Sequence, residues 1–88
     1  MSTPEAAEYD PVFVAAAARQ ADPGLPEDEA DRLAREAWQH LREVGAGDVA
    51  EIARRLLAGP NSTGATPANV VAKAAVSFCE THGVDPQA

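Results

Sequence analysis

The sequence is poor in large apolar side chains. Alanine supplies 20 of its 88 residues, whereas leucine, isoleucine, valine and phenylalanine together supply 16 and aromatic residues only 5%. No apolar run approaches the roughly 20 residues that a membrane-spanning helix needs. The N-terminal residues also lack the basic segment and apolar stretch that mark a secretion signal. We therefore expect a cytoplasmic protein with one small core and no membrane contact.

Cysteine and basic residues are also scarce. The single cysteine cannot form a disulfide within the chain. Seven basic residues stand against fourteen acidic ones, and residues 1–44 carry a net charge of −6 whereas residues 45–88 carry −1. Because proteins bind nucleic-acid backbones largely through lysine and arginine, this balance disfavours nucleic acid as a partner. The excess of acid keeps a small protein soluble and also suits a basic partner.

Apolar residues recur with the spacing of one face of an α-helix, and no segment alternates as a β-strand does. Helix starts and helix breakers divide this pattern into four segments, at residues 10–21, 26–44, 48–58 and 66–82. Helices with one apolar side bury that side against one another. The sequence predicts an all-α bundle of four short amphipathic helices over residues 10–84, with flexible tails at 1–9 and 85–88.

The expected helix boundaries rest on local signals. Asp10 and Thr66 are capping residues that each precede a proline, and proline suits the first turn of a helix. Asp48 is expected to cap the third helix in the same way. Gly59 precedes a proline, and we expect this glycine to adopt the left-handed conformation that ends many helices.

The segment 26–44 has the most regular apolar stripe. Its members are Ala30, Leu33, Ala34, Ala37, Trp38, Leu41 and Val44. In the first segment, the residues expected on one face are Val12, Phe13, Ala16 and Ala17. Bulky residues are too few to seal these stripes, so we expect the helices to gain stability from a partner. The contact residues that we expect are Trp38, Leu41 and Val44, because an exposed aromatic ring among apolar neighbours marks a binding surface.

Two motifs match part of a known functional pattern but lack residues that the pattern requires. Residues 59–66 have the spacing of a phosphate-binding loop, G-x-x-x-x-G-x-[ST], but Ala65 occupies the lysine position and no strand precedes the loop. We interpret the segment as a connection between helices. Cys79 and His82 have the spacing of two metal ligands. We expect instead a buried thiol and an exposed histidine near a helix end, and hence no metal site.

Residues 48–57 read DVAEIARRLL, which is similar to the first helix of a helix-turn-helix motif. In that motif a turn of about three or four residues leads to a helix that reads DNA. Here eight residues, 59–66, separate the two predicted helices. Asparagine can bond adenine and basic side chains meet phosphates. The resemblance therefore implies DNA contacts from Arg54, Arg55, Asn69 and Lys73.

No group of residues unites a nucleophile, a base and an oxyanion-stabilising group, so we predict no enzyme, no cofactor and no small-molecule substrate. A small acidic four-helix chain also resembles an acyl carrier protein, but the Asp-Ser-Leu motif of that family is missing. The leading hypothesis is a non-catalytic, regulatory protein–protein interaction module that binds another protein or a second copy of itself. The alternative is a helix-turn-helix-like DNA-binding transcriptional regulator that uses residues 48–82.

Overall fold

The computed structural model describes residues 8–60 and 62–88, and within these ranges it contains four α-helices and no strand. The helices are α1 (Pro11–Ala21), α2 (Glu27–Val44), α3 (Val49–Ala58) and α4 (Ala65–His82). The predicted fold class, a small all-α bundle, is confirmed. No helix in the described ranges combines the length and the apolar character needed to cross a membrane.

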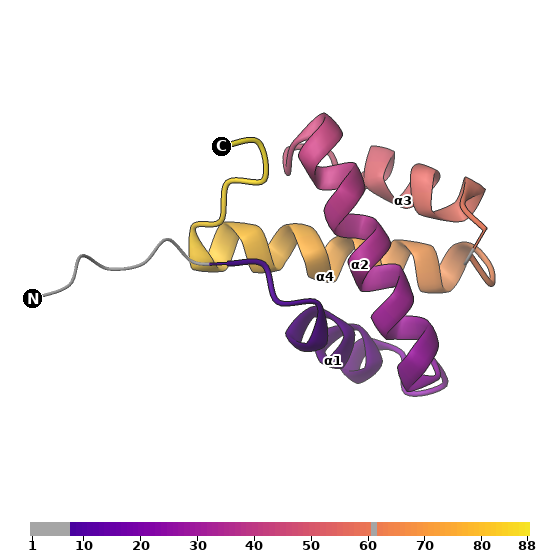
Figure 1. The fold of residues 1–88 in the computed structure, drawn as a ribbon. Helices are drawn as coiled ribbons and strands as arrows, with labels where there is room; N and C mark the ends of the chain where they lie inside the picture. The colour runs from indigo at the N-terminus through magenta and orange to yellow at the C-terminus, as the bar shows by residue number, and fades with distance from the viewer. Residues whose placement is uncertain (1–7, 61) are drawn as a thin grey trace, which may run out of the picture.

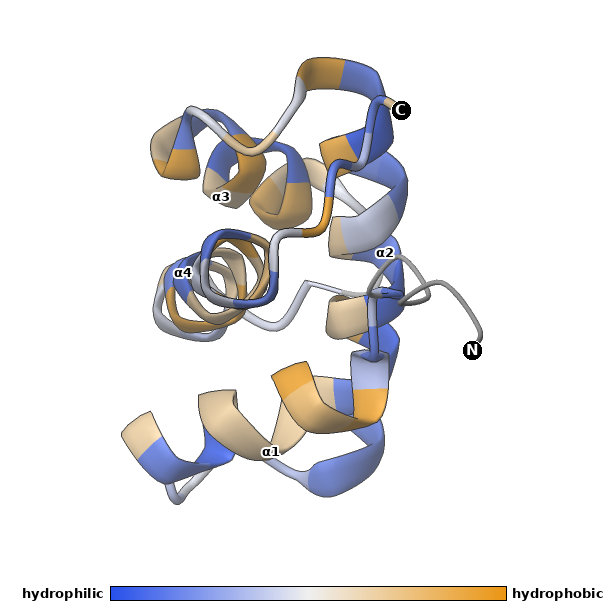
Figure 2. Ribbon diagram, turned by 90° about the vertical axis from the view of Figure 1, so that its left-hand side faces the viewer, coloured by the Kyte–Doolittle hydropathy of each residue, from blue (hydrophilic) through white to orange (hydrophobic). Residues whose placement is uncertain are grey.

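The helices form two layers (Figures 1 and 2). In one layer, α3, α4 and α1 stack in that order, and α2 crosses all three from the other side. Helices α3 and α4 lie side by side and run in opposite directions, whereas α1 and α3 flank the bundle and do not pack on each other. Their outer surfaces are consequently available at opposite ends of the molecule.

Two of the expected caps form as predicted. The Asp10 carboxylate accepts hydrogen bonds from the backbone N–H groups of Val12 and Phe13, and Pro11 is the first helical residue of α1. The Asp48 carboxylate accepts one from the N–H of Glu51 at 3.1 Å. These side chains satisfy N–H groups that have no partner within the helix.

Two other boundary predictions are wrong. Helix α4 begins at Ala65, with Gly64 before it, so Thr66 lies inside the first turn and makes no cap. Helix α4 can start at Ala65 because Pro67 still lies in its first turn. The N–H groups of a first turn have no partner within the helix, so the N–H that proline lacks leaves no helical hydrogen bond unmade. Gly59 is extended, with φ −78° and ψ 164°, and not left-handed. The proline that follows it explains this, since the residue before a proline favours extended backbone.

Alanine fills much of the core. Among the described residues, nineteen apolar side chains other than proline are buried, and nine of them are alanine. The largest fully buried side chains are Leu33, Leu41, Ile52, Leu56, Val14 and Val71. The removal of one of these large side chains would lower the free energy of unfolding by about 2–5 kcal/mol.

Both expected tails reach into the folded domain. Tyr9, placed by sequence in a flexible tail over residues 1–9, packs on the core and donates a hydrogen bond to the Ala34 carbonyl at 2.6 Å. Residues 1–7 lie outside the described ranges. At the other end, Pro86 is buried and the Gln87 side chain donates to the Glu43 carbonyl at 3.3 Å. Residues 85–88 therefore fold back against the end of α2 and are not a free tail.

Candidate interaction surface

Helix α1 buries a different face from the one expected. Val14, Ala15 and Ala18 are buried, whereas Val12 is 69% exposed and Phe13 is 53% exposed. The prediction fails because residues 11–18 carry no polar side chain, so the sequence offers no contrast between the two sides of the helix. Val14, Ala15 and Ala18 face the bundle, whereas Val12, Phe13 and Ala16 are exposed.

An open groove of about 680 Å³ runs between α1 and the first turns of α2. Its apolar side consists of Val12, Ala15 and Ala16 from α1. Its polar side consists of Glu27, Asp28 and Asp31 from α2, together with Arg19. The charged lining therefore contains three acids and one base. We refer to these seven residues as the α1–α2 groove.

The single cation of the α1–α2 groove is held by its own chain. The Arg19 Nε donates to the Leu25 carbonyl at 3.1 Å, and its guanidinium lies 3.5 Å from the Glu27 carboxylate. Asp28 and Asp31 pair with arginines one helical turn further along α2, Asp28 with Arg32 at 3.8 Å. These arginines do not line this groove but a second one, between α2 and α3. Each of the three acids of the α1–α2 groove therefore has an arginine of its own chain as its ion-pair partner.

An aromatic cluster anchors the start of α1. The Tyr9 ring stacks on Trp38 with centroids 4.7 Å apart and meets Phe78 edge-on at 5.8 Å. Phe13 continues the cluster, with its ring 5.4 Å from Phe78 and 5.7 Å from His82. Burial of the Tyr9 ring raises the pKa of its phenol well above the usual value, and Cys79 and Asp10 raise it further. Sequence reasoning missed this cluster because its members come from three segments that are distant in the chain.

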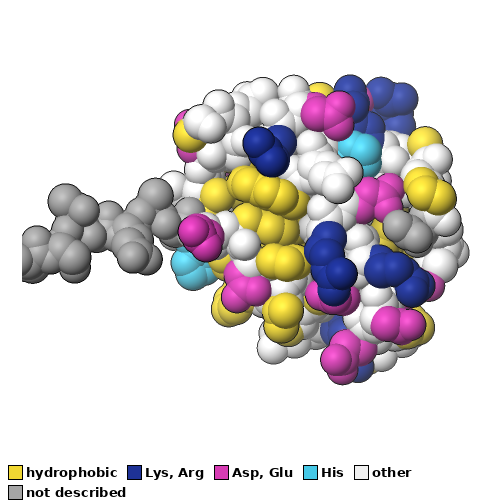
Figure 3. All heavy atoms as spheres, in the orientation of Figure 1, with side chains coloured by type: hydrophobic (Ala, Val, Ile, Leu, Met, Phe, Trp, Pro, Cys, Tyr) yellow, Lys and Arg dark blue, Asp and Glu magenta, His cyan; other side chains and the backbone are white. Residues whose placement is uncertain are grey.

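The three residues expected at a partner contact do not form one surface. Leu41 is fully buried in the core, so it cannot touch a partner in this fold. Trp38 and Val44 are partly buried against the core. Trp38 also lines a hollow of about 380 Å³ with Tyr9 and Val84. Figure 3 shows an apolar patch on this side of α2, while most of the lysine and arginine side chains visible on this face lie on its other half.

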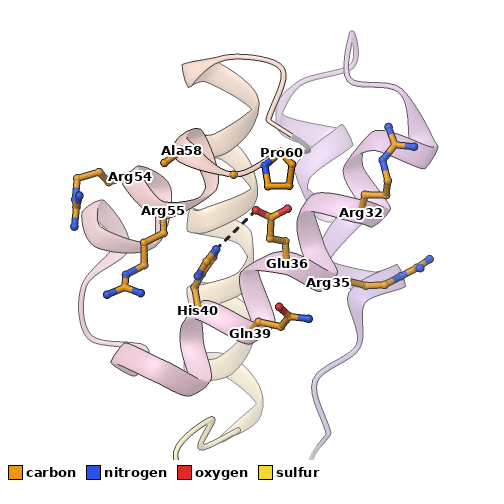
Figure 4. A pocket seen from close by; sticks show the side chains of 10 residues that line it. Arg32, Arg35, Glu36, Gln39, His40, Arg54, Arg55, Ala58 and Pro60 are labelled. Carbon is orange, nitrogen blue, oxygen red and sulfur yellow. Dashed lines mark ion pairs between the residues drawn. The ribbon is translucent and has the colours of Figure 1, made fainter.

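The groove between α2 and α3 has a volume of about 650 Å³ and carries an unusual pair at its base. Glu36 and His40 point into it, with the His40 Nε2 3.8 Å from the Glu36 carboxylate (Figure 4). Glu43 lies at the same distance from the His40 Nδ1, and neither ring nitrogen makes a hydrogen bond within the described residues. The side chains of Arg32 and Arg35 point away from this space (Figure 4). The groove therefore does not gather its positive charges around one point, as an anion site would.

The residues expected to contact DNA lie on α3 and α4. Arg54 and Arg55 both bond the Glu51 carboxylate, at 2.6 Å and 2.8 Å, and their hydrogen bonds lower the pKa of that carboxyl. Asn69 and Lys73 are exposed on α4. Six residues, 59–64, separate α3 from α4, whereas the turn of a helix-turn-helix motif has three or four. Arg54 and Asn69 line one hollow of about 220 Å³ between α3 and α4, whereas Arg55 and Lys73 do not line it.

Cys79, His82 and the 59–66 segment make contacts with other parts of the domain. Cys79 is buried, and desolvation raises the pKa of its thiol, as does the neighbouring charge of Glu80. His82 is exposed and packs its ring 4.3 Å from that of Phe78. The described residues contain no cluster of three potential metal ligands. In the 59–66 segment, the Thr63 hydroxyl donates to Glu29 at 2.9 Å, while Asn61 lies outside the described ranges.

No protein-family model, curated protein or solved structure matches this chain. One feature distinguishes the α1–α2 groove from the rest of the described surface. Its lining includes Val12, the most exposed of the large apolar side chains.

Proposed function

We propose that this chain is a small, acidic, non-catalytic helical module that binds another protein through the α1–α2 groove. The observation that carries the proposal is the 69% exposure of Val12 beside the alanines of the groove. An apolar side chain left outside, next to a hollow with a polar rim, is typical of a protein contact.

The regulatory role that we infer is that of an adaptor, since the proposal assigns no reaction to the module. We also propose that the module is cytoplasmic and that it can bind a second copy of itself. DNA binding through residues 48–82 has less support, because Arg54 and Arg55 are already paired with Glu51. A shift of labelled duplex DNA that fell with salt and disappeared on changing both arginines to alanine would favour this alternative.

The test replaces Val12 with a photo-crosslinking amino acid in the full chain. The chain is expressed in cells of the organism that encodes it. A second chain carries the same group at Ser77, which is exposed on α4 and distant from the groove in sequence. We expect a discrete protein adduct from position 12 and none from position 77. Excess unlabelled protein should compete for this adduct, and excess Val12→Asp protein should not.

Two results would refute the proposal. The first is equal labelling from both positions, because this indicates random encounters. The second is an adduct that Val12→Asp protein competes away as well as the unmodified protein does. Circular dichroism of Val12→Asp provides the folding control, and because this side chain is mostly exposed we expect the helical signal to be unchanged.

A further inference from the structure

We propose that the hollow beside Trp38 binds a methylated ammonium group, of the kind carried by a small quaternary amine or by a trimethylated lysine side chain. The hollow has a volume of about 380 Å³, and its described lining consists of Glu8, Tyr9, Trp38, Val84 and Asp85. We refer to these five residues as the Trp38 hollow. They include none of the residues of the α1–α2 groove, so the two sites are tested separately.

The charged lining of the Trp38 hollow is acidic. Glu8 and Asp85 are both exposed, and within the described residues neither carboxylate forms an ion pair with a base. Residues 1–7, which precede Glu8 in the chain, include no lysine, arginine or histidine. The two carboxylates therefore attract a cation from outside the chain and repel an anion.

Two aromatic rings line the same hollow. The rings of Tyr9 and Trp38 stack with centroids 4.7 Å apart and an interplanar angle of 13°, which covers one face of each ring. Both side chains still line the hollow, beside the apolar side chain of Val84. The π-electrons of an aromatic ring attract a cation, and aromatic rings are the usual receptors of quaternary ammonium and methyl-lysine groups.

The chemistry of the lining decides between kinds of cation. A divalent metal ion needs several ligands at short distances, and the described residues contain no cluster of three potential metal ligands. A primary ammonium is strongly hydrated and has three N–H groups to satisfy. A trimethylammonium group has no N–H, so it contacts the rings and Val84 through its methyl groups while its charge remains near the carboxylates.

Contacts outside the hollow hold its walls in place. The Tyr9 hydroxyl donates to the Ala34 carbonyl at 2.6 Å, which fixes the ring that stacks on Trp38. Asp85 accepts a hydrogen bond from the Gln87 N–H at 3.0 Å, and the Gln87 side chain bonds the end of α2. Because these residues are ordered before a ligand arrives, little ordering opposes binding.

Choline and its neutral isostere dimethylbutanol, in which a carbon atom replaces the nitrogen, test the inference. Binding to the full chain is followed by the fluorescence of Trp38, the only tryptophan in the sequence. The proton resonance of the ligand methyl groups, which an aromatic face shifts upfield, is a second readout. We expect choline to bind at least about fivefold more tightly than the isostere, since each ring contributes about twofold or more. Potassium chloride at the same concentration controls for ionic strength.

Matched variants locate the effect. The pair Glu8→Gln and Asp85→Asn should weaken choline about fivefold, the sum of two exposed charge interactions, and leave the isostere unchanged. Asparagine at position 85 keeps an oxygen that can accept the Gln87 N–H, so the local turn is retained. The control pair Glu27→Gln and Glu80→Gln removes the same charge from exposed positions outside the hollow, and we expect no change beyond about twofold.

Three results would overturn the inference: equal affinity for choline and its isostere, the same Trp38 fluorescence change with potassium chloride, or equal weakening by the two pairs of substitutions. Two short peptides that differ only in carrying trimethyllysine or lysine then identify the source of the ammonium group. Binding of the trimethyllysine peptide at least as tightly as choline indicates a methylated partner protein, and weaker binding indicates a free quaternary amine. Tighter binding of the lysine peptide than of both methylated ligands would refute the selection proposed here.

Discussion

Tyr9 provides a sharp test of the packing described above, because its contacts can be removed in two steps. Tyr9→Phe deletes only the hydroxyl and its 2.6 Å hydrogen bond to the Ala34 carbonyl. A bond of this kind contributes about 0.5–1.5 kcal/mol. Tyr9→Ala also removes the stack on Trp38 and the edge contact with Phe78, each worth about 0.5–1.5 kcal/mol beyond burial. We expect a total loss of about 3 kcal/mol for the alanine variant.

Thermal and urea unfolding measure these losses. In a domain of this size, 1 kcal/mol lowers Tm by about 4–8 °C, so Tyr9→Ala should melt at least about 12 °C lower. Circular dichroism reports the helices, and Trp38, the only tryptophan in the sequence, reports the stacked ring by its fluorescence. Val12→Ala is the control, with an expected change within about 0.5 kcal/mol. If Tyr9→Ala is no less stable than the control, residue 9 belongs to a free tail and the aromatic cluster does not hold α1.

The same residue predicts a pH dependence. Burial raises the pKa of Tyr9 in the folded protein, so the native state keeps its phenol proton when the unfolded chain, with a pKa near 10, has lost it. Stability therefore falls by about 1.4 kcal/mol per pH unit once the pH exceeds 10, and is unaffected by this group below that. Tyr9→Phe should reduce the slope. Because the sequence has one tyrosine, phenolate absorbance should appear only as the chain unfolds.

Three further changes test local features. Asp48→Ala should cost about 1 kcal/mol in urea unfolding because it removes the cap of α3, whereas Thr66→Ala should be nearly neutral; the reverse order would restore Thr66 as the cap. Gly45→Ala should cost at least about 1 kcal/mol, since φ is +85° and a Cβ would lie 2.8 Å from a Gln87 side-chain atom, whereas Gly47→Ala meets nothing within 4 Å and should leave Tm unchanged. Cys79 should react with a thiol reagent only at the rate of unfolding, because it is buried and its pKa is raised; fast native labelling would contradict this.

Local signals predicted most of the secondary structure. The stripe of α2 was confirmed from Ala30 to Leu41, because strongly polar residues between the apolar ones leave only one side to bury. Asp10 and Asp48 cap their helices because the acceptor and the N–H groups are a few residues apart. Thr66 was misjudged because a proline can occupy more than one position of a first turn, so the motif fixes the start only to within a residue or two.

The candidate surface could not be predicted in the same way. Leu41 belonged to the right stripe, but the stripe alone did not show that α2 is covered there by the other helices. The α1–α2 groove combines residues from two helices, and its acidic rim was visible in the sequence only as a charge run.

The sequence by itself determined four helices, most of their ends and the buried side of α2, because each depends on residues less than about two turns apart. Only the tertiary structure decided which face of α1 is buried, because Val12, Phe13 and the alanines are all apolar and the choice depends on how closely α2 and α4 can approach. It also decided that Tyr9 belongs to the domain. The hydroxyl of that residue finds its acceptor at Ala34, 25 positions away, and local spacing carries no information on such a contact.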